Sequence, residues 1–231
     1  MTAGAAAPEA AEAPPADLVH AWSMLVALTL AIATGRRAVL VGLAWLAFGR
    51  FVWRGRAAWL PMRFGPPNAV TLVRLGLVSA LALGAQSYGG AALAGLGLLV
   101  YALDGLDGLL ARRWGFASAF GAAFDVETDG YYVAALGVAL WGRGVAGAWV
   151  LVPGFLRYAH VLTVHHFRWR GEAPRRRYAR YAFSVLAVLF SLALLPTAAA
   201  PWAAAAAAAV VTTSFAKSWW WASRVVAPAP S

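Results

Sequence analysis

The sequence predicts an all-α, polytopic integral membrane protein, and three observations support this fold class. Hydrophobic residues make up 62% of the 231-residue chain and charged residues only 12%, a balance unlike that of a soluble domain. Apolar runs recur along the chain, each near the length that crosses roughly 30 Å of hydrocarbon. Most arginines stand in short segments between these runs, where arginines anchor helix ends against anionic lipid.

The composition also excludes several classes of site. The chain has no cysteine, so disulfides, thiolate zinc sites and cysteine nucleophiles are ruled out. The formal charge of +10 at pH 7 could indicate nucleic-acid binding, but the arginines flank apolar runs and are not interleaved with aromatic residues in a pattern suited to bases. We therefore expect membrane lipids, and no nucleic acid, as partners of the basic residues.

Four segments are expected along the chain. Residues 1–17 contain Ala, Pro and Glu without a basic residue, which is typical of a disordered tail. Residues 18–53 are expected to form an N-terminal apolar hairpin, and residues 54–67 an amphipathic helix at the membrane surface. Residues 68–224 then form a six-helix membrane domain.

Eight apolar runs are the expected helices, and they cover residues 18–34, 38–53, 68–87, 89–111, 117–141, 145–167, 179–196 and 201–222. The first two runs are short. If both span the bilayer, the protein has eight spans; if residues 38–53 are re-entrant or interfacial, it has seven. Pro153 lies inside the sixth run and is expected to kink its helix.

The arginines also predict an orientation. The short loops alternate so that most arginines, including Arg112 and Arg113, share one side of the bilayer. Among the last six spans, only Arg143 falls clearly on the other side. The positive-inside rule assigns the arginine-rich side to the cytoplasm, and we expect a bacterial inner (plasma) membrane.

Acidic residues gather in a stretch that otherwise has the composition of a membrane helix, namely Asp104, Asp107, Asp125, Glu127 and Asp129. Carboxylates in lipid are costly and mark a functional site. Asp104 and Asp107 are three residues apart, and Asp125 and Asp129 four, so each pair faces one side of its own helix. Two facing helices would bring four carboxylates together. Such a group needs cations, and oxygen ligands favour Mg²⁺ or Mn²⁺.

Other residues near the acids favour phosphoryl chemistry. Small residues lie on the same helical stripes as the acids, where they permit a ligand or a second helix to approach closely; they are Gly108, Ala111 and Gly121. Arg112 lies one turn beyond Asp107 and can pair with a phosphate. Two metal ions could bridge a pyrophosphate and stabilise charge on the group that leaves. Glu127 points away from Asp125 and Asp129 on a helix, and a structural role is expected for it.

These residues together form the pattern D-x2-D-G-x2-A-R-x8-G-x3-D-x3-D over residues 104–129, which resembles the signature of the CDP-alcohol phosphotransferase (CDP-alcohol phosphatidyltransferase) family at every fixed position. The resemblance implies a six-span family core with one or two extra N-terminal apolar helices. It also implies a reaction in which a hydroxyl of an acceptor alcohol attacks the lipid-linked phosphorus of a CDP-alcohol, usually CDP-diacylglycerol, and CMP leaves. Because family members are commonly homodimers, a homodimer is expected.

The resemblance also assigns roles to single positions. It implies two Mg²⁺ or Mn²⁺ ions held by Asp104, Asp107, Asp125 and Asp129. Asp129 further matches the position assigned as general base. The nucleotide would be bound by Gly108, Ala111 and Arg112, with Gly121 as the close-approach glycine.

A second stretch of the sequence resembles the start of the first core helix of the family, which borders the nucleotide. It reads Pro-Asn-x-x-Thr-x-x-Arg and supplies Asn68, Thr71 and Arg74 as further nucleotide-binding candidates. The alternative is structural: Asn68 would cap its helix, and Arg74 would extend to a lipid phosphate.

Two arginines are candidates for binding the acceptor. Arg157 lies well inside a span and needs a partner or an aqueous cavity, and Arg180 opens the next span after a run of arginines. Both could bind an acceptor that carries phosphate, such as glycerol 3-phosphate or inositol phosphate. Choline, serine or phosphatidylglycerol are alternative acceptors, and membrane anchoring is the alternative role for the arginine run. A divalent-cation transporter is the competing function, although its acids would spread along a route across the bilayer.

Overall fold

The computed structural model describes residues 18–60, 64–113, 116–167 and 177–225, and these residues form helices without any strand. The predicted all-α class is therefore confirmed. The expected tail at residues 1–17 lies outside the described residues, as do all of the arginines between residues 168 and 176.

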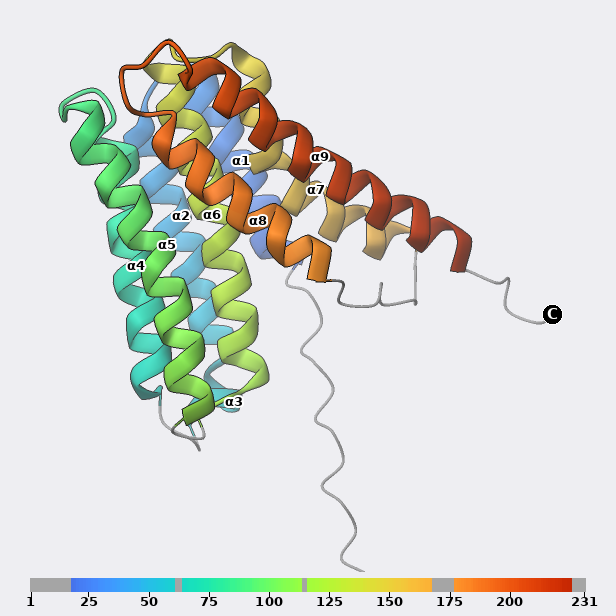
Figure 1. The fold of residues 1–231 in the computed structure, drawn as a ribbon. Helices are drawn as coiled ribbons and strands as arrows, with labels where there is room; N and C mark the ends of the chain where they lie inside the picture. Colours follow the sequence, from blue (N-terminus) through green and yellow to red (C-terminus); the bar gives the residue numbers. More distant parts are fainter. Residues whose placement is uncertain (1–17, 61–63, 114–115, 168–176, 226–231) are drawn as a thin grey trace, which may run out of the picture.

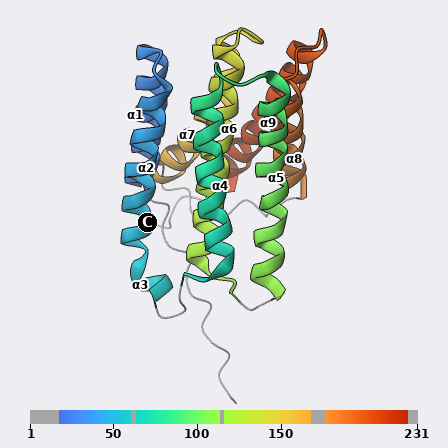
Figure 2. The ribbon, with the colours of Figure 1, turned by 90° about the vertical axis from the view of Figure 1, so that its left-hand side faces the viewer.

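The described helices follow one another as α1 (Leu18–Thr34), α2 (Arg37–Arg54), α3 (Arg56–Trp59), α4 (Gly65–Gly84), α5 (Gly90–Arg113), α6 (Ala119–Gly142), the 3₁₀ helix η2 (Ala148–Leu151), α7 (Val152–His166), α8 (Arg177–Leu192) and α9 (Ala200–Val225). Helices α1, α2, α4, α5 and α6 run roughly along one direction (Figures 1 and 2), whereas α8 and α9 cross them obliquely (Figure 1). The long helices thus form an up-and-down bundle with α7, α8 and α9 leaning away from it.

Two stretches among the described helices are long and apolar enough to cross a membrane, Gly65–Gly84 and Gly90–Leu110. Helix α1 and residues Tyr178–Leu192 of α8 are apolar but shorter. Seven of the eight apolar runs each correspond to one helix whose ends lie within a few residues of the expected ones, and the run at residues 145–167 is the exception.

The structure differs from two local expectations. The run at residues 145–167 is divided into η2 and α7, and Pro153 lies in the first turn of α7, where its missing N–H is not needed. It therefore begins a helix and does not kink one. A surface helix was expected over residues 54–67. Within the described residues, this segment contains the single turn α3, and α4 begins at Gly65.

Glycines set the distances between several helices. A methyl group added to Gly154 of α7 would lie 2.8 Å from the Ala134 Cα of α6, and one added to Gly137 of α6 would lie 2.9 Å from the Val150 carbonyl oxygen. Both distances are shorter than real contacts of a Cβ atom, so α6 can pack this closely on α7 at Gly154 and on η2 at Gly137 only with glycine at these positions.

The N-terminal hairpin packs on the bundle through aromatic rings. Phe48 and Phe51 of α2 contact Phe124 of α6, with ring centroids 6.1 and 6.4 Å apart. The Trp45 indole Nε1 also donates to the Ser79 hydroxyl of α4 over 3.0 Å. These contacts attach α2 to α4 and α6 by apolar burial and one hydrogen bond.

A polar clamp joins the helix ends farthest from α3. The Arg143 guanidinium donates to the carbonyl oxygens of Ala85 and Tyr88 over 2.8 and 3.0 Å, and the Gln86 amide donates to the Gly142 carbonyl over 3.5 Å. Arg143, the exception to the predicted charge distribution, is thus bound to carbonyl groups of the α4–α5 turn.

The close approach of α6 and α7 can be tested by replacing Gly154 with leucine. Its side chain would collide with the Ala134 backbone, and overpacking of this kind costs about 1–3 kcal/mol. We expect the thermal unfolding midpoint of the detergent-purified protein to fall by several degrees. Gly95→Leu on α5 is the matched control, because a methyl group there has no neighbour within 4 Å among the described residues. Equal midpoints for the two variants would contradict the packing.

Candidate metal centre

Three aspartates from two helices meet in the half of the bundle near α3. Asp104 comes from the second half of α5, and Asp125 and Asp129 come from the first half of α6. Each offers a carboxylate oxygen, and these oxygens all lie within 4.8 Å of one another. Their side chains remain 21–34% exposed. Three of the four aspartates expected to meet therefore converge from two facing helices.

Arg74 of α4 lies beneath this group and binds all three aspartates. Its guanidinium donates to Asp125 Oδ1 and to Asp129 Oδ1, each over 2.5 Å. A third ion pair joins it to Asp104 Oδ1 at 3.0 Å. The Arg74 side chain is fully buried, whereas the aspartates are partly open to the outside.

This arrangement settles one alternative for Arg74. A side chain with no exposed surface does not extend to lipid phosphate, so that interpretation was wrong. Among the described side chains, three carboxylates bind this one guanidinium. The guanidinium is planar and has several donors, so it can hold oxygens from three side chains in one fixed arrangement.

The other two residues of the Pro-Asn-x-x-Thr-x-x-Arg stretch are also buried. The Asn68 amide donates to the Phe64 carbonyl over 2.6 Å, and the Thr71 hydroxyl donates to the Pro67 carbonyl over 3.2 Å. A methyl group added to Gly121 would lie 2.9 Å from Asn68 Oδ1. Gly121 therefore permits α4 and α6 to approach closely. Asn68 lies inside α4 and does not cap it.

The remaining signature residues lie in the last turns of α5. Asp107, Ala111 and Arg112 belong to this helix, but their side chains lie outside the described part of the structure. Gly108 is half-buried one turn after Asp104. The backbone of α5 thus carries Asp107 on the turn that follows Asp104, as the spacing predicted.

The donor set fits a divalent cation. Carboxylate oxygens are the ligands that Mg²⁺ and Mn²⁺ prefer. Asp104, Asp125 and Asp129 are partly exposed, so an ion can reach them from outside. Three carboxylate oxygens within 4.8 Å of one another would favour such an ion.

The two acceptor candidates lie elsewhere. Arg157 of α7 donates to Glu127 Oε1 over 2.5 Å, and its side chain is 26% exposed. The partner that an arginine inside a span requires is therefore Glu127. Arg180 is exposed in the first turn of α8. The structure does not place either arginine in the aspartate group.

Sequence reasoning missed His20 of α1, which lies 3.6 Å from Glu127 through Nε2. His20 is almost fully buried. A histidine within the first apolar run was the available signal, because an ionisable residue in such a run requires a partner.

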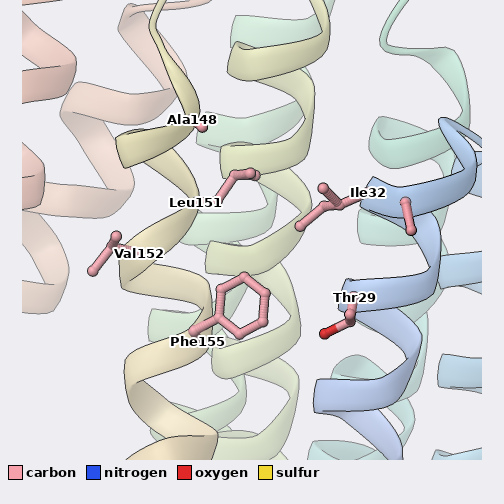
Figure 3. Close-up of a pocket in the computed structure, with 7 residues that line it drawn as sticks. Thr29, Ile32, Ala148, Leu151, Val152 and Phe155 are labelled. Atoms are coloured by element: carbon pink, nitrogen blue, oxygen red, sulfur yellow. The ribbon is translucent and has the colours of Figure 1, made fainter.

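A cavity of about 360 Å³ lies at a different place in the bundle (Figure 3). It is lined by the end of α1 and by η2 and the start of α7, with almost wholly apolar surface; Thr29, Ile32, Leu151 and Phe155 are among the lining residues. These segments adjoin the C-terminal end of α6, whereas Asp125 and Asp129 lie in its first half. This cavity is therefore separate from the aspartate group.

The role of Arg74 in holding the aspartates can be tested by Arg74→Met. This change leaves three carboxylates without their shared cation, and breaking a buried ion pair costs about 3–5 kcal/mol. We expect a lower thermal midpoint in detergent, and a smaller loss for Arg74→Lys, which keeps the charge but not the planar fork. Arg36→Met, which removes an arginine with an exposed side chain, is the control. A midpoint that Arg74→Met leaves unchanged would show that the ion pairs are not maintained in solution.

Comparison with known proteins agrees with the signature. A sequence model of the CDP-alcohol phosphatidyltransferase family matches residues 64–220. Searches of curated proteins and of solved structures give no match. The family match covers more than half of the chain and contains Arg74 and all the signature residues, but excludes α1 and α2. Members of this family take a CDP-alcohol as donor and an alcohol as acceptor and use divalent metal ions. The chain therefore belongs to the CDP-alcohol phosphatidyltransferase family.

Proposed function

We propose that the protein is an integral-membrane enzyme of phospholipid synthesis that transfers a phosphatidyl group from CDP-diacylglycerol to the hydroxyl of an acceptor alcohol and releases CMP. The observation that carries this proposal is the convergence of Asp104, Asp125 and Asp129 within 4.8 Å in a chain of this family. In the reaction, the acceptor oxygen forms a bond to the lipid-linked phosphorus, the bond from that phosphorus to CMP breaks, and the hydroxyl proton leaves.

The site residues have distinct roles in this proposal. Asp104, Asp107, Asp125 and Asp129 would hold two divalent ions, Mg²⁺ or Mn²⁺. When bound, such ions offset the charge of a diphosphate and of its leaving group. Asp129 is also proposed as the group that accepts the proton of the acceptor hydroxyl.

The nucleotide half of the donor is assigned to the residues around these aspartates. Arg112 would pair with a phosphate. Gly108 and Ala111 would leave room for the nucleotide on the same face of α5, and Gly121 keeps α6 close to α4. Asn68, Thr71 and Arg74 would border the nucleotide from α4. Buried Arg74 would do so from beneath, while holding the aspartates in place.

We further propose that the helices form a polytopic membrane bundle. Residues 68–224 would be the six-helix catalytic domain and residues 18–53 an added hairpin. Two helices long and apolar enough to cross a membrane support this setting, as does the distribution of arginines. The aspartate site would face the cytoplasm of a bacterial inner membrane. The homodimer that the resemblance implies stays a prediction.

The acceptor is proposed to carry a phosphate group, as glycerol 3-phosphate and inositol phosphate do. The support is Arg157, which is 26% exposed and packs against α6, together with exposed Arg180 at the start of α8. Choline, serine and phosphatidylglycerol are the alternative acceptors.

Release of CMP tests the activity directly. The purified full-length protein is incubated with CDP-diacylglycerol, Mg²⁺ or Mn²⁺, and each acceptor in turn, and CMP and lipid products are measured by mass. We expect CMP release that depends on the acceptor and stops when EDTA removes the metal. A lack of CMP release with every acceptor, together with metal flux into liposomes, would support a divalent-cation transporter instead.

Replacing single aspartates tests the ligand roles. Asp125→Asn and Asp107→Asn each remove a charged ligand while keeping the side-chain size, so we expect turnover to fall at least about 100-fold with the helices still folded. Circular dichroism and gel filtration in detergent monitor the fold. Glu172→Gln is the matched control, since it removes a carboxylate outside the signature. Turnover near the wild-type rate in either variant would remove that aspartate from the metal site.

A further inference from the structure

A second polar group lies on the other side of α6 from the aspartates. It consists of His20, Glu127, Arg157 and Tyr158, which we call the hairpin cluster. Glu127 is two residues from both Asp125 and Asp129, and a separation of two residues turns a helical side chain by about 200°. The hairpin cluster therefore shares helix α6 with the metal site but occupies a different face of it.

Glu127 is the centre of the hairpin cluster. Its Oε1 accepts a hydrogen bond of 2.5 Å from Arg157, and its Oε2 lies 3.6 Å from His20 Nε2. Glu127 is 8% exposed, so water screens these charges weakly. One carboxylate thus lies between a cation of α7 and an imidazole of α1.

His20 is the contribution of the N-terminal hairpin. Its ring packs edge-on against Phe48 and Phe51, with centroids 4.7 and 5.4 Å apart, and it lies beside Tyr158 of α7. The same two phenylalanines attach α2 to α6. His20 is therefore held by both helices of a hairpin that lies outside the part of the chain matched by the family.

Gly130 leaves room for Arg157 beside the backbone of α6, where it reaches Glu127. A methyl group added to Gly130 would lie 3.0 Å from the Arg157 Cγ and 3.2 Å from the Tyr158 hydroxyl oxygen. Arg157 therefore runs directly along the backbone of α6 at the residue after Asp129. A guanidinium has five N–H donors, so Glu127 can bind one end while the partly exposed remainder stays accessible to a phosphate.

Stability alone gives a poor account of the hairpin cluster. A buried ion pair is often no more stable than well-packed apolar residues of similar volume. In the described part of the structure, Glu127 Oε2 and the Tyr158 hydroxyl also make no hydrogen bond, which further lowers the gain from burying them. Apolar side chains would join α1, α6 and α7 at least as well. A role in positioning Arg157 gives a reason for charged ones.

We propose that His20 and Glu127 are positioning residues that fix Arg157 for binding the phosphate of a phosphorylated acceptor alcohol. The N-terminal hairpin is then part of the catalytic unit, because its His20 sets the position of Glu127. This inference rests on the proposed function and deepens it, since it names the acceptor class and gives the added hairpin a task.

Acceptor kinetics distinguish positioning from simple packing. KM and kcat of the full-length protein are measured for glycerol 3-phosphate and inositol phosphate, and KM for CDP-diacylglycerol is measured in parallel. We expect Glu127→Gln to raise the acceptor KM about fivefold, because the amide keeps the hydrogen-bond acceptor but loses the charge. His20→Phe keeps an aromatic ring against Phe48 and Phe51 but removes the imidazole nitrogen that faces Glu127. This variant should also raise the acceptor KM several-fold. The donor KM should stay unchanged in both.

A double variant separates binding from folding. Glu127→Leu with Arg157→Leu replaces the ion pair by an apolar pair, so the thermal midpoint should stay near that of the wild type while the acceptor KM rises about tenfold or more. Adding His20→Phe to this double variant should raise KM no further, because residues that act through one another are not additive. Trp22→Phe, an exposed aromatic change on α1, is the control and should match the wild type.

The possible outcomes are distinct. Lower thermal midpoints with an unchanged acceptor KM in Glu127→Gln and His20→Phe would overturn the positioning role and leave the phosphatidyltransferase standing. Wild-type turnover only with acceptors that lack a phosphate would overturn it as well. Absence of turnover with every acceptor would overturn both the inference and the proposed function.

Discussion

Concentrating carboxylates inside an apolar bundle is the constraint on which the rest of the structure depends. Three aspartates within 4.8 Å repel one another strongly in a weakly screened environment. Arg74 offsets part of this repulsion from beneath, since its rigid guanidinium binds Oδ1 of each aspartate. The three converging carboxylates thus have a defined geometry and would attract a cation. A site built in this way is preorganised before any cation arrives.

Close backbone packing is the means by which the helices satisfy this constraint. Gly121 brings α6 against Asn68 of α4, and Gly130 lets Arg157 pass along the backbone of α6. Each glycine lies within four residues of an aspartate. Small residues in α6 therefore allow close packing on two faces of the helix. One face packs against α4, which carries Arg74, and the other packs against Arg157. The hairpin α1–α2 packs on this core through aromatic rings and adds His20 to it.

Much of this organisation could be predicted from the sequence, and the limits have physical causes. Apolar runs predicted the helices because hydrophobic length is a local property, and acid spacing predicted the convergence of Asp104 with Asp125 and Asp129. The partner of Arg74 could not be predicted, since spacing within one helix carries no information on which helix lies opposite. For the same reason the sequence predicted a structural role for Glu127 but did not predict its contacts with Arg157 and His20. The division of the sixth apolar run into η2 and α7 just before Pro153 was not predicted, because hydropathy does not show where a helix ends.

The clamp at Arg143 has a consequence for the distant aspartates. It binds the end of α6 to the turn between α4 and α5, and a straight helix transmits an axial displacement along its whole length. A slip of α6 by one residue would move Asp125 by about 1.5 Å and swing it around the axis by about 100°, out of reach of Arg74. The outlying arginine thus fixes the register in which carboxylates of two helices meet, and the alignment of the site is set partly from the opposite rim of the bundle.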